Sequence, residues 1–238
     1  MYNITNNIPR TNNLDIIYMD LKYIIFELLK WSPGIIYPVS HIVQLVDMYK
    51  MKHDDKHPLN IDLDMTTFLF FYIGNMGAYF FNKDYFSVQV WLAYIIPSIL
   101  EAYIYVYAKI LDNEKINAII SGIILTVVII AVIAVAYKIQ NHKRLVHKID
   151  IIGEYAGFLP AILFPLGILL QFIKIVKKKS FNLVSKNGWV LMAVGNIGSY
   201  ILANQFSNWK SITAFVLSAI FSICIVIYIA VNQKNDES

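Results

Sequence analysis

Two stretches of the chain follow one pattern. Leu21 to Lys52 reads LKYIIFELLKWSPGIIYPVSHIVQLVDMYKMK, and Lys148 to Lys179 reads KIDIIGEYAGFLPAILFPLGILLQFIKIVKKK. The second stretch aligns with the first at a shift of 127 residues, and the alignment needs no gap. The identical pairs include Glu27 and Glu154, Pro33 and Pro160, Pro38 and Pro165, Gln44 and Gln171, Lys50 and Lys177, and Lys52 and Lys179. The chain therefore carries an internal repeat.

A second matched block follows each stretch. Ile73 to Tyr79 reads IGNMGAY, and Val194 to Tyr200 reads VGNIGSY, at a shift of 121 residues. The six residues by which the first copy is longer fit the polar insert HDDKHPLNIDLD at His53 to Asp64. We therefore expect one three-helix unit over residues 23–110 and an equivalent unit over residues 150–231.

The composition places these helices in a membrane. With 58% hydrophobic residues, 15% charged residues and a mean hydropathy of +0.55, the chain is too apolar for a soluble domain. A membrane span needs about 20 largely uncharged residues. Charge-free runs extend from Ile116 to Tyr137, Tyr155 to Ile173, Asn187 to Ser207, Ser211 to Val231 and Met65 to Asn82. Tyr85 to Ala108 is charged only at Glu101, and the most polar span is Trp31 to Val46.

The predicted fold class is an all-α membrane protein with seven transmembrane helices. Two parallel three-helix bundles are joined by a linker helix at residues 116–138, a 3+1+3 layout. Residues 1–22 form a polar head and residues 232–238 a polar tail. Because a single linker span leaves both copies pointing the same way, we expect a substrate site between them near the membrane midplane.

The charges suggest an orientation for the chain. The net charge of +4 could indicate a nucleic-acid partner, but the lysines lie at span ends and in loops, so we expect no nucleic acid and the lipid bilayer as surroundings. The loops after the first, third and fifth spans carry somewhat more lysine. This favours an external or lumenal N-terminus, without indicating which membrane.

Four prolines at matched depths are candidate hinges: Pro33, Pro38, Pro160 and Pro165. Proline inside a helix removes a hydrogen bond and kinks it, and a double bend suits a helix that flexes between two states. The alternative is that these bends only shape the packing.

Polar side chains repeated in the second helix of each copy are candidates for binding a solute. Asn75 and Tyr79 lie one turn apart, as do Asn196 and Tyr200, and an amide beside an aromatic ring can line a polar cavity. Gln44 and Gln171 fit structural hydrogen bonding better than substrate contact.

Two titratable residues are candidates for proton coupling. Glu101 is a carboxylate within a span, which is costly and often functional. The alternative is a neutral structural acid, and the sequence favours neither. His41 lies one turn from Gln44, but Ile168 takes its place in the second copy, so a buried structural histidine is the stronger interpretation.

No catalytic or metal-binding pattern is present. The chain has no C-x-x-C motif, and its hydroxyl residues have no positioned base. Its one H-x-x-x-H pair, His53 and His57, lies with Asp54 and Asp55 in the polar insert, where a solvated loop is the stronger interpretation than a metal site. We therefore expect no enzymatic activity, no cofactor and no metal site.

The stretch LQFIKIVKKKSFNLVS at Leu170 to Ser185 resembles the signature of PQ-loop transporters, which include SWEET and SemiSWEET sugar carriers and cystinosin. The matching positions are Gln171, Lys174, Lys177, Lys179 and Ser180. LEAYIYVYA at Leu100 to Ala108 is similar to the third helix of SWEET proteins, and Tyr94 aligns roughly with their sugar-binding asparagine. Leu170 and Val43 replace the defining proline, so the motifs are degenerate.

The resemblance implies a transporter of a small polar solute, a sugar or an amino acid, that works by alternating access. The alternative is a receptor or assembly factor of the same superfamily that transports nothing and uses the basic loop Lys174 to Lys186. A membrane enzyme ranks third. The sequence leaves homo-oligomer formation open.

Overall fold

The computed structural model describes residues 13–53, 63–80, 87–140, 158–179, 183–205 and 209–236. Within these ranges every regular element is a helix. The helices are α1 (Asn13–His53), α2 (Met65–Phe80), α3 (Val88–Val90), the π-helix η1 (Trp91–Ile95), α4 (Ile96–Leu111), α5 (Lys115–Gln140), α7 (Phe158–Lys178), α8 (Lys186–Gln205) and α9 (Trp209–Asp236). Residues 1–12 of the polar head, residues 237–238 of the tail and Ser180 lie outside the described residues.

Four helices are long and apolar enough to cross a membrane. They cover Val88–Leu111, Lys115–Ile139, Phe158–Lys178 and Ile212–Asn232. The helix α5 is apolar on all sides, and large side chains such as Ile116, Ile123 and Ile130 are more than half exposed. Such a surface is suited to lipid and unfavourable in water. The four helices indicate an integral membrane protein.

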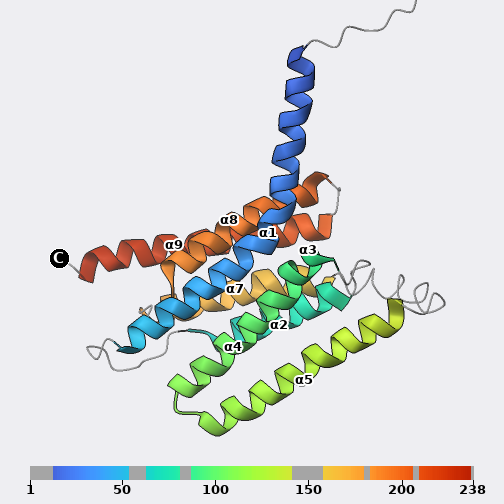
Figure 1. Ribbon diagram of the computed structural model, residues 1–238. Helices are drawn as coiled ribbons and strands as arrows, with labels where there is room; N and C mark the ends of the chain where they lie inside the picture. The colour runs from blue at the N-terminus through green and yellow to red at the C-terminus, as the bar shows by residue number, and fades with distance from the viewer. Residues whose placement is uncertain are drawn as a thin grey trace, which may run out of the picture.

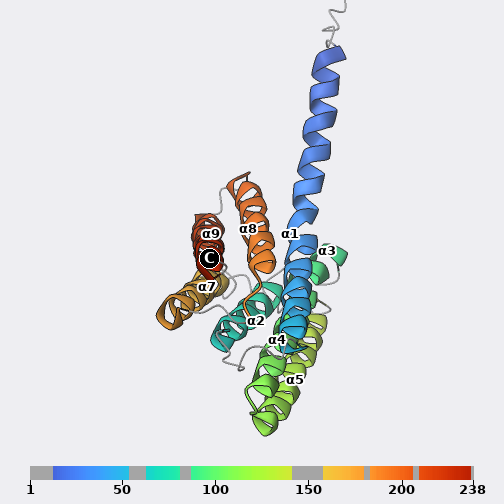
Figure 2. The ribbon, with the colours of Figure 1, turned by 90° about the vertical axis from the view of Figure 1, so that its left-hand side faces the viewer.

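The helices pack as two groups that contact each other twice. In the first group α4 packs against α1 and α2, and in the second α9 packs against α7 and α8. The groups meet where α1 packs against α8 and where α2 packs against α7 (Figure 1). In the repeat, α7 is equivalent to α1, α8 to α2 and α9 to α4. The contact of α1 with α8 is therefore equivalent to the contact of α7 with α2. The remaining helix, α5, lies at the outer edge against α4 and α2 (Figure 2).

Glycines allow the two groups to approach closely. A Cβ atom on Gly74 would lie 2.7 Å from Cε1 of Phe164, and one on Gly195 would lie 2.8 Å from Cε1 of Tyr37. Each member of the first contact is the repeat equivalent of a member of the second. A second matched set consists of Gly77 with Leu159 and Gly198 with Ser32. The interface between the groups is thus built twice from corresponding residues.

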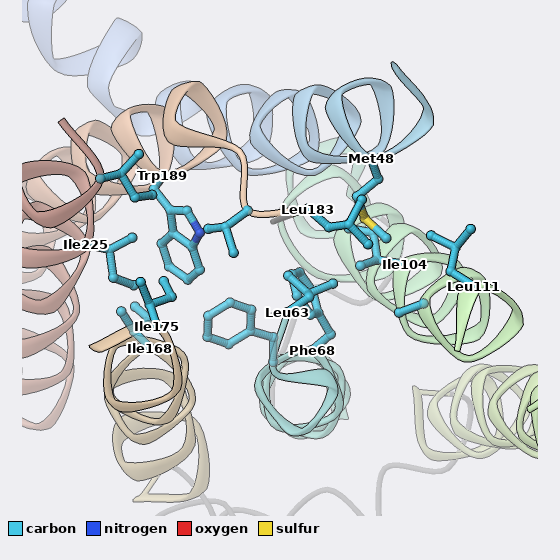
Figure 3. Packing of buried hydrophobic residues seen from close by; sticks show 14 residues of the cluster. Met48, Leu63, Phe68, Ile104, Leu111, Ile168, Ile175, Leu183, Trp189 and Ile225 are labelled. Atoms are coloured by element: carbon cyan, nitrogen blue, oxygen red, sulfur yellow. The ribbon is translucent and has the colours of Figure 1, made fainter. Parts of the chain in front are cut away.

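A shared apolar core joins both groups (Figure 3). Its fully buried members include Met48 of α1, Ile104 of α4, Ile175 of α7 and Ile225 of α9. Ile104 and Ile225 are 121 residues apart, the same shift as the second block of the repeat. The correspondence between the copies therefore extends into their third helices.

The prolines affect the two copies differently. Pro33 and Pro38 lie inside α1, which continues through both as a single helix. Figure 1 shows that α1 changes direction where it joins the other helices, and its N-terminal part projects beyond them. Pro165 lies inside α7, but Pro160 is the third residue of that helix. Because the first turn has no intrahelical acceptor for its N–H groups, Pro160 removes no helical hydrogen bond.

Candidate functional site

Gln44 and Gln171 bind the backbone of the opposite group. Gln44 donates from Nε2 to the carbonyl of Leu183 at 2.5 Å, and its Oε1 accepts from the N–H of Ser185 at 2.9 Å. Gln171 accepts from the N–H of Asp64 at 2.6 Å. Asp64 and Ser185 are repeat equivalents, each just before the second helix of its copy. We call Gln44, Gln171 and these backbone partners the glutamine latch.

A charged side chain accompanies each latch residue. Asp47 accepts a hydrogen bond from the hydroxyl of Ser185, and Lys174 donates to the carbonyl of Leu63 at 2.5 Å. Asp47 and Lys174 occupy equivalent positions one turn beyond the glutamines, with opposite charges. Both contacts cross between the groups, so this end of the interface is closed by polar bonds.

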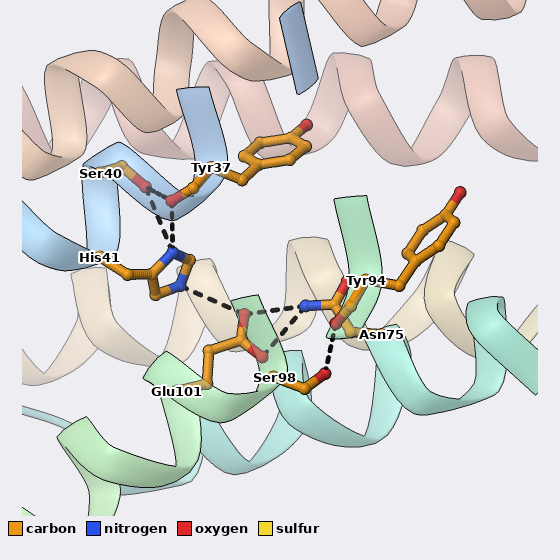
Figure 4. Close-up of polar contacts among 7 residues, drawn as sticks. All are labelled: Tyr37, Ser40, His41, Asn75, Tyr94, Ser98 and Glu101. Atoms are coloured by element: carbon orange, nitrogen blue, oxygen red, sulfur yellow. Dashed lines mark hydrogen bonds and ion pairs between the residues drawn. The ribbon is translucent and has the colours of Figure 1, made fainter. Parts of the chain in front are cut away.

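A buried polar cluster lies further along the interface (Figure 4). The carboxylate of Glu101, 1% exposed, accepts from Nδ2 of Asn75 at 2.9 and 3.0 Å. Its Oε1 lies 3.2 Å from Nε2 of His41. On the other side of the ring, Nδ1 of His41 lies 2.7 Å from the carbonyl oxygen of Tyr37, which also accepts from the hydroxyl of Ser40.

The tyrosine extends this cluster to the second copy. The Tyr37 hydroxyl donates to Oδ1 of Asn196 at 3.0 Å and lies 3.0 Å from the hydroxyl of Ser199. Nδ2 of Asn196 is buried and has no hydrogen-bond partner among the described residues. Asn75 and Asn196, which are repeat equivalents, thus contact different partners.

The cluster belongs to one copy only. In the second copy Phe164 occupies the position of Tyr37, Ile168 that of His41 and Ser222 that of Glu101. Ile168 is buried in the apolar core, and Ser222 donates to the carbonyl of Ser218 at 2.7 Å in its own helix. The fold of the second copy is therefore maintained without these polar groups.

Tyr94 lies in the π-helix η1, next to the cluster. Its carbonyl accepts from the hydroxyl of Ser98 at 2.8 Å. The ring extends away from the contact between His41 and Glu101, as does that of Tyr37 (Figure 4). Pro97, at the start of α4, lacks the N–H that a regular helix would use here. Such single π-turns are frequent at functional sites.

The two other tyrosines singled out in the sequence have different surroundings. Tyr79 is fully buried in an apolar cluster with residues of α5, whereas Tyr200 is 36% exposed. The equivalence expected for them from the repeat does not extend to their environments, because α5 covers only the first copy.

A small cavity lies between the glutamine latch and the polar cluster. The volume open to the centre of a water molecule is about 10 Å³, enough for about one water. Its lining consists of Ser40, His41, Gln44, Phe68, Phe71, Gly188, Trp189 and Met192. The asparagines and tyrosines expected to line a solute cavity are not part of this lining.

Sequence reasoning missed Tyr37, Ser40 and Asp47, although a signal was present. With His41 and Gln44 they recur every three or four residues, which places polar side chains on one face of α1. The described residues contain no group of three or more histidine, cysteine, aspartate or glutamate side chains that could hold a metal ion.

No family model, curated protein or solved structure matches the chain.

Proposed function

We propose that this chain is a multi-pass membrane transporter that moves a small polar solute, a sugar or an amino acid, by alternating access. On this proposal α1, α2 and α8 also cross the membrane. Together with the four apolar helices they form two parallel three-helix bundles, joined by α5. Opening and closing the interface between the bundles would expose the solute first to one side and then to the other.

The observation that supports this most is the composition of the interface. Two halves that rock against each other need contacts that can break at one end without unfolding either half. The glutamine latch is such a contact, because its hydrogen bonds join the halves and lie outside their helices. The polar cluster further along the interface offers hydrogen-bonding groups to a polar solute once the halves separate.

Membership of the PQ-loop superfamily is part of the proposal. The equivalent positions of Gln44 and Gln171 and their equivalent backbone contacts support it. The substrates of SWEET proteins and cystinosin do not transfer, since the residues that would bind them differ here.

One observation fits the alternative, a receptor or assembly factor that transports nothing, as well as it fits a transporter. The cavity at the interface holds about one water, which is far too small for a sugar. A transporter in a closed state and a protein with a permanently closed interior would both have this feature. The exposed lysines Lys177, Lys178 and Lys179 would then be the functional surface.

A thermal-shift screen of the purified protein against sugars and amino acids, at two pH values, separates the two functions. For a transporter we expect saturable stabilisation by one class, followed by uptake of the same compound into proteoliposomes. Asn196→Ala should abolish uptake, because the amide lies buried in the interface with an unused donor. Asn187→Ala is the matched control, since Asn187 is exposed on the same helix. A folded sample stabilised by no compound would favour the receptor or assembly factor.

A further inference from the structure

The contact between His41 and Glu101 requires a proton. A carbonyl oxygen only accepts hydrogen bonds, so the 2.7 Å contact with Tyr37 places a hydrogen on Nδ1 of His41. Nε2 then lies 3.2 Å from Oε1 of Glu101, which is within ion-pair distance but outside hydrogen-bond geometry, either as a second N–H or as a lone pair. Two acceptors cannot share a favourable contact at this distance. A proton on Nε2 or on the carboxyl group therefore makes this contact favourable.

The surroundings stabilise either location of this proton. If the proton is on His41, the anionic carboxylate still accepts from Asn75 at both oxygens. If it is on Glu101, neither group carries a charge, which suits a site 1–3% exposed. No lysine or arginine side chain in the described part of the chain contacts either residue. The titratable groups nearby are Tyr72 of α2, Tyr94 of η1 and Tyr37 of α1, all neutral as phenols.

The pair is not needed to build the interface. The second copy packs the equivalent positions with Ile168 and Ser222 and has the same helix neighbours. Burying two titratable groups costs free energy unless they stay in contact with each other. Because the second copy packs without such a pair, we infer that the pair has a role beyond packing.

Polar side chains of α1 lie between the pair and one end of the molecule, beside a mainly apolar cavity. Ser40, His41 and Gln44 line the cavity that holds about one water, and Asp47 follows one turn later on the same face of α1. A water in this cavity has a titratable ring on one side and the glutamine latch on the other. Opening the latch would widen its access to bulk solvent.

We propose that His41 and Glu101 form a proton-binding site that exchanges one proton with water as the interface opens, which rests on the proposed function and makes solute movement proton-linked. In the closed state the proton lies between Nε2 and Oε1. When the first group separates from α7 and α8, water reaches the pair and accepts the proton, leaving a neutral His41 and an ionised Glu101 bonded to Asn75. Return to the closed state takes one proton from water on the side that is then open.

Nuclear magnetic resonance of ¹⁵N-histidine tests the site without any solute. The chain has five histidines, and loss of a signal in His41→Ile assigns the one from His41. We expect this signal to shift in one single-proton step as the pH rises. The step should be lost in Glu101→Gln, because the amide can donate to Nε2 and accept from Asn75, which holds the ring neutral. Glu114→Gln, a partly exposed carboxyl between α4 and α5, should leave the step unchanged. A wild-type signal that never shifts, or an equal step in Glu101→Gln, overturns the proposal.

Proteoliposomes with a trapped pH indicator test the coupling, with radiolabelled glucose and a mixture of the standard amino acids as probes. We expect a proton gradient to drive accumulation in the wild type. Glu101→Gln should retain exchange at equal pH and lose this accumulation. The double variant His41→Ile/Glu101→Ser, which carries the residues of the second copy, should behave likewise.

The outcomes separate the two proposals. If the wild type takes up solute at a rate that does not depend on the pH gradient, the proton inference is overturned and the transport proposal is unaffected. A wild type that moves none of the probes counts against the proposed function and removes the coupling, while the histidine signal still decides whether the pair binds a proton.

Discussion

At the scale of single residues, the glutamine latch joins helix capping to the contact between the copies. Ser185 caps α8, because its hydroxyl accepts from the N–H of Gly188 at 3.0 Å. Gln44 satisfies the backbone N–H of the same residue from the opposite group. The Gln44 side chain thus binds a backbone N–H at the start of α8 that has no acceptor within its own helix. In a capping box, a side chain of the same helix plays this role.

Gln44→Leu should lower the free energy of unfolding by about 1–2 kcal/mol, because it removes two buried hydrogen bonds between the groups, one to the carbonyl of Leu183 and one from the N–H of Ser185. Denaturation of the purified protein in mixed micelles measures the change. Gln89→Leu is the control, since Gln89 is only partly buried on the short helix α3. Equal losses in the two variants would show that the latch adds nothing specific.

The sequence was sufficient to single out most residues of the polar cluster and the latch. Glu101, His41, Gln44 and the asparagines stand out because polar groups are rare in apolar spans. Tyr37 does not, since its counterpart Phe164 is apolar and a tyrosine fits an apolar pattern. Which of these residues touch could not be predicted, because the contacts join different helices and depend on how those helices pack.

At the scale of helices, the glycines at the crossings control how closely the copies approach. Gly195→Ala should destabilise the protein by about 1–3 kcal/mol. The added Cβ would lie 2.8 Å from Tyr37, whose ring is held by hydrogen bonds at its hydroxyl. Gly122→Ala is the matched control: its Cβ would meet Val106 at 3.5 Å, an ordinary contact, so helix propensity should stabilise it by up to about 1 kcal/mol. Thermal unfolding of both variants measures the difference, and a neutral Gly195→Ala would mean that the crossing is loosely packed.

The prolines of α1 and α7 give a second pair of matched variants. Pro38→Ala restores an N–H inside α1, so we expect a stability gain of up to about 3 kcal/mol and slower uptake as the helix stiffens. Pro160→Ala should change neither quantity, because Pro160 lies in the first turn of α7. Uptake into proteoliposomes and the unfolding temperature are measured together. Unchanged uptake in Pro38→Ala would make the proline a packing feature.

Helix existence was predictable from sequence, but helix ends and irregularities were not. The charge-poor runs locate the helices because lipid requires them. The early start of α1 at Asn13 was missed, since the charged residues there interrupt the apolar pattern. The π-helix before Pro97 was missed because a proline removes one hydrogen bond without indicating which neighbouring acceptor takes over.

At the scale of the whole molecule, the repeat predicts corresponding contacts and not the state of the interface. Corresponding residues meet at the glycine crossings and at the latch, as a repeat with conserved packing requires. The sequence does not indicate whether the interface is open or closed at the end that carries the glutamine latch, because both states use the same helices. The structure has this end closed, through Asp47 with Ser185 and Lys174 with Leu63.

A disulfide across the latch tests whether this end must open. Asp47 and Ser185 are in hydrogen-bond contact, so cysteines at these two positions lie within reach of each other. In a Cys224→Ala background, which removes the only native thiol, we expect oxidised Asp47→Cys/Ser185→Cys to lose uptake of the solute found by thermal shift. A reductant should restore it to at least the wild-type rate, because the native bond between Asp47 and Ser185 is then also absent.

Each single cysteine variant, treated with the same oxidant, is the control, since it carries the substitution without the crosslink. A permanently closed receptor or assembly factor has no need to open this end, so its partner binding should survive oxidation of the double variant. If the crosslinked protein takes up solute as fast as the reduced one, movement at the latch is not part of transport. The pathway would then have to avoid the contact between α1 and α8, which is the interface that carries Tyr37, His41 and Asn196.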